Sequence, residues 1–184
     1  MTISMHSASV PIFVRMLGNL STWLDKAAAH ATEKKFEPSV YLSARLAPDM
    51  LPMSAQIQIA CDTVKFCVAR LAGVESPKFE DTEASLDDLK QRIAKTIDYA
   101  QSVRAAQIDG SDSRPISVPR RGGAITMTGE AYLKHFALPN FFFHVTTTYA
   151  LLRHNGVQLG KMDYLGALPQ GETTASAING ARAA

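Results

Sequence analysis

Apolar side chains recur every three or four residues along four long stretches of the chain, which is the spacing of one face of an α-helix. Connectors rich in proline, glycine and polar residues separate these stretches. The pattern therefore predicts four long amphipathic helices. They cover residues 9–32, residues 53–72, residues 81 or 82 to about 106, and residues 139–156.

Local start and stop signals support these limits. Pro139 suits the first turn of a helix, where its missing N–H would have no partner. Ser54 suits the N-cap of the second helix because its hydroxyl can accept a hydrogen bond from a free backbone N–H. Gly73 and the Asn155-Gly156 pair are typical helix stops, since these residues adopt left-handed backbone readily.

The segment between the third and fourth helices has a different pattern. Residues 115–119 and 124–128 alternate between apolar and polar positions, and an Arg-Arg-Gly-Gly sequence joins them. This arrangement predicts a small β-hairpin near residues 116–128. An isolated hairpin is only marginally stable, so we expect it to pack on the helices. Residues 130–136 could add one short helix.

These elements predict an all-α fold, a four-helix bundle with long connectors and one minor hairpin. A chain of 184 residues is long enough to bury a core as a single domain, which we place at residues 1–168. Residues 169–184 are small and polar, and we expect them to form a flexible tail.

Charge and composition argue against several classes of partner. The net charge is only +2 and no basic run is long, so we expect no nucleic-acid partner. The longest apolar runs fall far short of the roughly 20 residues that span a bilayer, so we expect no membrane partner. The N-terminus lacks the pattern of a secretory signal, and the expected compartment is the cytoplasm. Cys61 and Cys67 lack CxxC spacing and are expected to be buried free thiols.

His144 is the most informative polar residue because it lies among aromatic residues in the fourth helix. Asn140 and Thr148 lie one turn away on the same face. On the second helix, Gln58 and Asp62 are also one turn apart and could converge with them. One interpretation is a pocket in which Asp62 and His144 form a catalytic acid–base pair. The other is a buried hydrogen-bonded network that fixes the helix register.

Three successive phenylalanines at 141–143 point around nearly the whole circumference of one helical turn. They are therefore either buried on all sides, or one of them faces a partner subunit. We expect a homodimer that forms through helix faces.

Seven phrases carry a family resemblance over most of residues 1–166. The chain resembles an uncharacterised bacterial family within the DinB-like, or YfiT-like, superfamily of four-helix bundles. The phrases are RLAPDM (45–50), QIQIACD (56–62), ARLAGV (69–74), FEDTE (79–83), LPNFFFH (138–144), LRHNGV (152–157) and GKMDYLG (160–166).

In many DinB-like proteins three histidines bind a divalent metal. One comes from the second helix, and two lie four residues apart on the last helix. His144 matches the last of these, whereas Asn140 replaces the other histidine of that pair and the position on the second helix falls near Gln58. With one histidine of three, the resemblance implies that no cofactor is bound. If a divalent metal does bind, His144 is the one candidate ligand.

Three functions are compatible with this reading. The resemblance suggests a bundle that has lost its metal site and acts as a binding or stress-associated protein, with a possible small-molecule ligand. The alternative is a metal- or thiol-dependent transferase or hydrolase-like enzyme that uses Asp62 and His144. The third is a structural or interaction module with the hairpin as its contact surface. Whether the protein is an enzyme is left open by the sequence.

Overall fold

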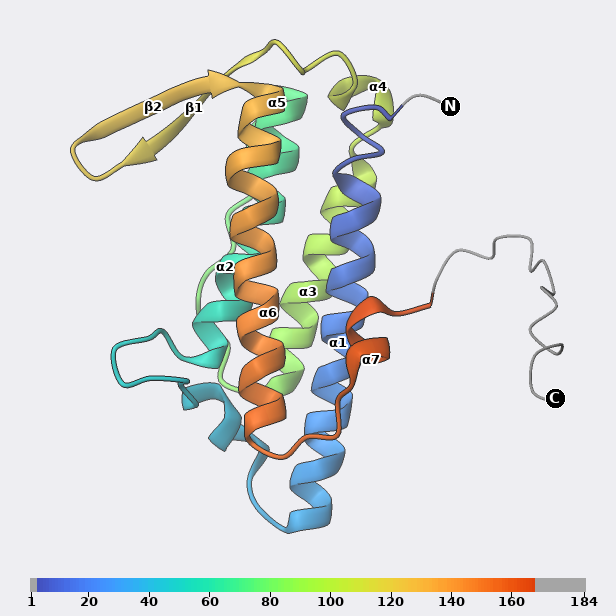
Figure 1. The fold of residues 1–184 in the computed structure, drawn as a ribbon, viewed down its shortest axis with the longest axis vertical. Coiled ribbons are helices and arrows are strands. Elements are labelled where there is room, and N and C mark those ends of the chain that lie inside the picture. Colours follow the sequence, from blue (N-terminus) through green and yellow to red (C-terminus); the bar gives the residue numbers. More distant parts are fainter. Residues whose placement is uncertain (1–2, 168–184) are drawn as a thin grey trace, which may run out of the picture.

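The computed structural model describes residues 3–167 and is mostly helical (Figure 1). The predicted tail at 169–184 lies outside the described residues. Four long helices form the body of the molecule, and none of the described helices is long and apolar enough to cross a membrane. The long helices are α1 (Val10–Lys34), α2 (Met53–Ala72), α3 (Leu86–Ser102) and α6 (Leu138–His154).

Aromatic pairs at the centre of the body hold α1 against α6. The rings of Phe13 and Phe141 meet edge to face with centroids 4.9 Å apart, and those of Trp23 and Tyr149 meet at 5.6 Å. Residue numbers rise together in these pairs, so α1 and α6 run in the same direction. Edge-to-face pairs of buried rings add about 0.5–1.5 kcal/mol each beyond their burial.

Helix α2 lies between α6 and α3 and packs against both. A long connection, residues 73–85, returns along α2 before α3 begins, so α2 and α3 run parallel (Figure 1). The body is therefore cross-connected, with two helices running in each direction.

Helix α3 begins later than the sequence pattern predicts, and it ends at Ser102 rather than near residue 106. Its N-cap is Ser85, whose hydroxyl accepts a hydrogen bond from the backbone N–H of Asp88, whereas residues 81 and 82 are not helical. The acidic side chains of Asp81 and Glu83 instead form ion pairs with Arg92. The predicted Ser54 cap is also wrong, because α2 has Pro52 at its N-cap and no side-chain cap.

Shorter elements lie at the two ends of the body, except for α7 (Lys161–Leu165), which packs against the side of α1. The predicted short helix near 130–136 exists, but it continues without a break into α6 through one π-helical turn. These elements are η1 (Pro38–Ser43), α4 (Ala105–Ile108), α5 (Gly129–Tyr132), η2 (Leu133–Ala137) and α7 (Lys161–Leu165).

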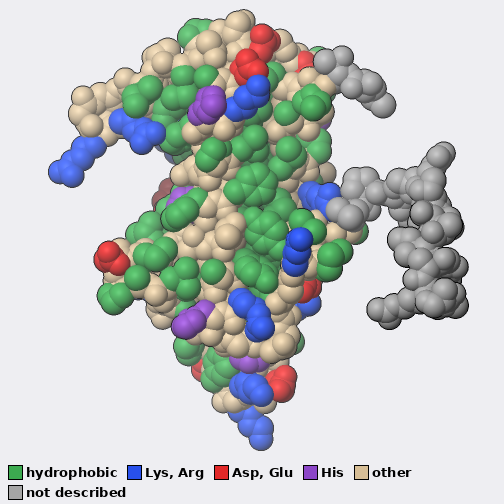
Figure 2. Space-filling view, in the orientation of Figure 1, with side chains coloured by type: hydrophobic (Ala, Val, Ile, Leu, Met, Phe, Trp, Pro, Cys, Tyr) green, Lys and Arg blue, Asp and Glu red, His purple; other side chains and the backbone are tan. Residues whose placement is uncertain are grey.

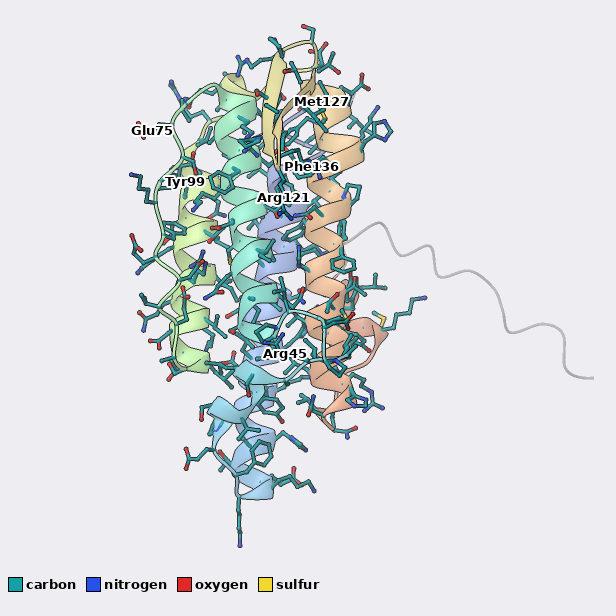
Figure 3. The ribbon with its side chains drawn as sticks, turned by 90° about the vertical axis from the view of Figure 1, so that its left-hand side faces the viewer. Arg45, Glu75, Tyr99, Arg121, Met127 and Phe136 are labelled. Atoms are coloured by element: carbon teal, nitrogen blue, oxygen red, sulfur yellow. The ribbon has the colours of Figure 1, made fainter. Side chains whose placement is uncertain are left out.

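The predicted hairpin is present as an antiparallel pair, β1 (Pro115–Arg120) and β2 (Gly123–Thr128). Ile116 and Val118 of β1 are buried, while most of β2 is exposed. The hairpin projects sideways from the helices (Figure 1), and in Figure 3 its end with Arg121 is turned toward the viewer.

Candidate functional site

His144 is buried in the interface between α6 and α2. Its side chain is engaged with Gln56, whose Oε1 lies 2.7 Å from His144 Nδ1. The Gln56 amide nitrogen donates to the Leu51 carbonyl, so Oε1 must be the acceptor and His144 Nδ1 the donor. The Nε2 atom of a neutral His144 therefore carries the free lone pair.

Burial also sets the charge of this histidine. Only 8% of His144 is exposed, and desolvation lowers the pKa of its imidazole below the ordinary value. The neutral ring is thus the stable form near pH 7, which agrees with the tautomer that Gln56 imposes.

The other predicted residues of α6 are also satisfied by protein partners. The Asn140 side chain donates to the Thr63 hydroxyl at 2.7 Å, which joins α6 to α2. The Thr148 hydroxyl donates to the backbone carbonyl of His144 at 2.9 Å. The Asn140 contact fixes α6 against α2, whereas the Thr148 contact lies within α6.

Gln58 and Asp62 lie on another face of α2. Gln58 donates to Glu83 at 2.8 Å, and Asp62 forms ion pairs with Arg92 at 2.9 Å and Lys65 at 3.0 Å. No hydrogen bond joins Asp62 to His144 among residues 3–167. The five predicted pocket residues thus fall into two groups on two sides of α2.

Helix geometry explains the separation. Gln56 and Thr63 are seven residues apart, so they share one face of α2, and this face meets α6. Asp62 is six residues from Gln56, which places it about 120° around the helix. The residue of α2 that meets His144 is therefore Gln56, two positions from the Gln58 that counting along the sequence suggests.

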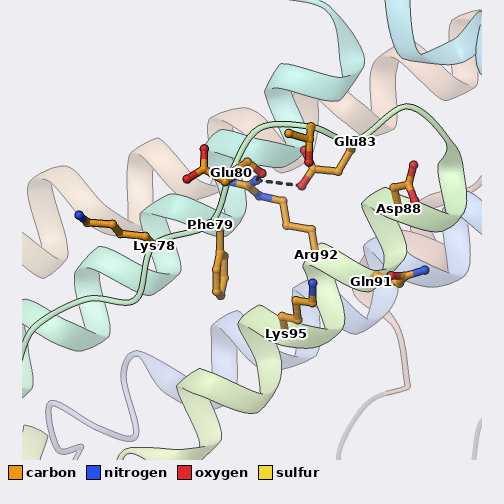
Figure 4. Close-up of a pocket in the computed structure, with 9 residues that line it drawn as sticks. Lys78, Phe79, Glu80, Glu83, Asp88, Gln91, Arg92 and Lys95 are labelled. Atoms are coloured by element: carbon orange, nitrogen blue, oxygen red, sulfur yellow. Dashed lines mark hydrogen bonds and ion pairs between the residues drawn. The ribbon is translucent and has the colours of Figure 1, made fainter.

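The second group centres on Arg92, which the sequence analysis did not select. This side chain is nearly fully buried, and its guanidinium contacts a carboxylate from α2 and others from the 78–83 segment, of which Figure 4 shows Glu83. The signal in the sequence was a cation on the apolar stripe of the third helix, between Leu89 and Ile93. Its partners are Asp62, Asp81 and Glu83, at 2.9 Å each, and the carbonyl of Glu80 at 3.1 Å.

These contacts fix the charge of Glu83. Burial works to raise its pKa, but hydrogen bonds from Arg92 and Gln58 outweigh burial and hold the pKa below its ordinary value. Phe79 covers the cluster from one side, with Lys65 Nζ 4.7 Å and Arg92 Cζ 5.9 Å from the ring centroid. The arrangement fastens the long 73–85 connection to α2 and α3.

A cleft of about 360 Å³ opens beside this cluster (Figure 4). Its lining is polar and balanced in charge, because three cations face three carboxylates. Two of these carboxylates already accept hydrogen bonds from the protein: Glu83 from Arg92, and Asp88 from the backbone N–H of Ala84. The lining residues are Lys78, Phe79, Glu80, Thr82, Glu83, Asp88, Gln91, Arg92 and Lys95.

The donor set near His144 does not fit a divalent metal. Zinc sites use three or four imidazole, thiolate or carboxylate ligands. The groups here are one imidazole, two neutral amides and one hydroxyl, all joined in pairs by hydrogen bonds. Within residues 3–167, no three His, Cys, Asp or Glu side chains lie close enough together to hold a metal ion.

The two cysteines are buried free thiols in helix α2. Burial raises the pKa of Cys61 to about 12 and also raises that of Cys67. Both are therefore protonated at neutral pH and are poor nucleophiles.

The three phenylalanines of α6 have different environments. Phe141 is fully buried, Phe142 is half-buried and Phe143 is 56% exposed. Phe143 borders a groove of about 530 Å³ that contains no charged residue, and apolar side chains gather over this face of the molecule (Figure 2). The groove is lined by Leu46, Met50, Pro139, Phe142, Phe143, Thr146, Thr147 and Ala150.

Comparison with known proteins agrees with this fold. The model of a domain of unknown function, DUF1993, matches residues 5–165. The crystal structure of a DinB family member protein from Shewanella denitrificans is 41% identical in sequence and similar in fold, with a TM-score of 0.82. The match covers 90% of this chain and 94% of that chain. No curated protein matches the chain.

Proposed function

Because the chain belongs to the DUF1993 family, a domain of unknown function with a solved relative that is a DinB family member protein, we propose that it is a binding protein. In this proposal a DinB-like four-helix bundle has lost the three-histidine metal site. Its remaining binding surface is the uncharged groove along α6, and its ligand is a small apolar molecule.

The observation that carries this proposal is the engagement of His144 and Asn140. Each is held by a neutral partner on α2, Gln56 and Thr63 respectively. A metal could bind the free Nε2 of His144 without breaking its bond to Gln56, but the neighbouring amides and hydroxyl are neutral, so it would recruit only one good ligand. The former site has therefore become part of the contact between α2 and α6.

The groove is large enough to hold a small molecule. Its volume of about 530 Å³ lies within the usual range for ligand pockets, about 300–1,000 Å³. Its two threonine hydroxyls are already engaged, that of Thr147 with the Phe143 carbonyl and that of Thr146 with the Tyr164 hydroxyl. The groove thus offers apolar surface and no free side-chain hydroxyl. Such a lining favours an uncharged ligand.

Gln56 links the groove to His144. The loop that supplies Leu46 and Met50 to the groove also contains Leu51, whose carbonyl accepts from the Gln56 amide. The same Gln56 side chain accepts from His144. The former metal position therefore supports one wall of the proposed binding surface.

The test is titration with the uncharged fluorescent apolar probe N-phenyl-1-naphthylamine. Ala150→Trp should fill the groove and abolish saturable binding. Ala94→Trp, at an exposed position of α3 outside the groove, is the matched control and should bind like the unaltered protein. Near-UV circular dichroism checks that both variants keep their packing. Unchanged binding by the Ala150→Trp variant would refute the groove as the site.

A second candidate is an enzyme in which His144 Nε2 accepts a proton. The tautomer imposed by Gln56 leaves this nitrogen with a lone pair, and it makes no hydrogen bond to residues 3–167. Asp62 cannot orient the ring in the present arrangement, because it is engaged by Arg92 and Lys65. A reaction that is lost in His144→Gln but kept in Asp62→Asn would support this candidate.

A further inference from the structure

The hairpin has two edges with opposite properties. The turn at Arg121-Gly122 contains two residues, so the closing pair Arg120–Gly123 is a hydrogen-bonded pair. Pairs alternate along an antiparallel ladder, so Val118–Ile125 and Ile116–Met127 are also hydrogen-bonded. The N–H and C=O groups of the remaining residues point away from the partner strand.

On β1, the outward residues are Pro115, Ser117 and Pro119. Two of the three have no N–H, so this edge offers one backbone donor only. Proline at such positions is a common means of blocking strand addition. The outer edge of β1 is therefore closed to a further strand.

On β2, the outward residues are Ala124, Thr126 and Thr128. All three have an N–H that donates to no other segment among residues 3–167, whereas the Thr128 carbonyl is occupied as the N-cap carbonyl of α5. The strand is also exposed and projects beyond the helices (Figure 1). One edge of the hairpin is thus blocked while the other is open.

We propose that the open edge of β2 pairs with β2 of a second copy of this chain, in an antiparallel register centred on Thr126. In this register Ala124 faces Thr128 of the second copy, and Thr126 faces its own counterpart. Thr126 then forms a hydrogen-bonded pair with its counterpart, and the Thr128 N–H can donate to the Ala124 carbonyl of the second copy; centring the register on Ala124 or Thr128 does not achieve both. The two hairpins become one four-stranded sheet with a two-fold axis.

Side chains of β2 suit this register. Ile125, which is 49% exposed, faces Met127 of the second copy, and the reciprocal pair forms across the axis. The ladder between the two copies ends at Thr128, because the next residues belong to α5.

Two proline variants test the proposal at the backbone. Thr126→Pro removes one outward N–H from the open edge, while Ser117→Pro removes the remaining outward N–H from the blocked edge. Neither N–H belongs to the β1–β2 ladder, so both hairpins should form. Sedimentation equilibrium at up to about 1 mM protein detects a dimer with a dissociation constant of about 1 mM or tighter. The unaltered chain and Ser117→Pro should dimerise in this range, and Thr126→Pro should remain monomeric.

A side-chain variant gives a second measurement that leaves the backbone intact. Ile125→Lys should weaken the dimer, because it replaces the exposed apolar side chain that faces Met127 of the second copy. The proposal is overturned if the unaltered chain is monomeric throughout the concentration range, or if Thr126→Pro dimerises as well as Ser117→Pro. It is also overturned if Phe143→Ser alone abolishes the dimer, because the α6 groove would then be the interface.

Discussion

A single buried cation, Arg92, determines where the third helix begins. It draws Asp81 and Glu83 out of a helical first turn and holds the 78–83 segment in an extended path. Its side chain is 2% exposed, so water weakens its ion pairs far less than it weakens ion pairs at the surface.

Replacing Arg92 should therefore destabilise the protein strongly. Arg92→Met leaves Asp62 and Glu83 without their main cation, and we expect a loss of about 3–5 kcal/mol in the free energy of unfolding. Lys90→Met, which breaks the exposed Lys90–Asp25 pair, should cost at most about 1 kcal/mol. Urea unfolding monitored by circular dichroism measures both, and equal effects would contradict the account.

The pH dependence of stability provides a second test at the residue scale. The pKa of Glu83 is lower in the folded state than its ordinary value of 4.5, so the folded state favours the ionised form. This contribution is present above pH 4.5 and is lost as the pH falls through the lower, folded pKa. Glu83→Gln should therefore lose less stability than the unaltered protein between pH 6 and pH 3, measured by urea unfolding at each pH.

The tautomer of His144 can be measured directly. The hydrogen bond to Gln56 predicts a proton on Nδ1, and burial predicts titration below the ordinary value of 6.5. Long-range ¹H–¹⁵N spectra of the imidazole over a pH series report both properties. A proton on Nε2 at pH 7 would contradict the assigned hydrogen-bond direction.

Among the elements, the four long helices could be predicted from the sequence because their apolar periodicity and their stops are local signals. The start of α3 could not be predicted, because acidic residues are favourable at a helix N-terminus and are equally favourable as ion-pair partners of a buried arginine. The hairpin was also predicted, since its alternation and glycine turn are local. The π-helical turn before α6 has no local signal comparable to these.

The caps of α2 and α3 give a prediction at the scale of the element. Ser85 caps α3 through the N–H of Asp88, whereas Ser54 makes no cap on α2. Ser85→Ala should destabilise the protein by about 1 kcal/mol, and Ser54→Ala should change its stability little. Thermal unfolding of the two variants makes the comparison, and a larger effect at Ser54 would contradict the assigned helix starts.

For the whole molecule, it was harder to predict which side chains of α2 and α6 meet at the candidate site than to predict the fold. His144, Asn140 and Thr148 share a helix face, as expected from their spacing. The partner helix was correct, but its contact residue is Gln56 because only packing decides which face of α2 meets α6. Gln58 and Asp62 instead support the crossover that makes α2 and α3 parallel.

Zinc binding tests the central claim most directly, and the chain offers its own positive control. Gln56→His/Asn140→His would place three imidazoles where Gln56, Asn140 and His144 now lie. Each protein is incubated with zinc, desalted, and analysed by metal mass spectrometry. The account predicts no stoichiometric zinc in the unaltered protein and about one ion per chain in the double variant. One zinc per chain in the unaltered protein, lost in His144→Ala, would contradict it.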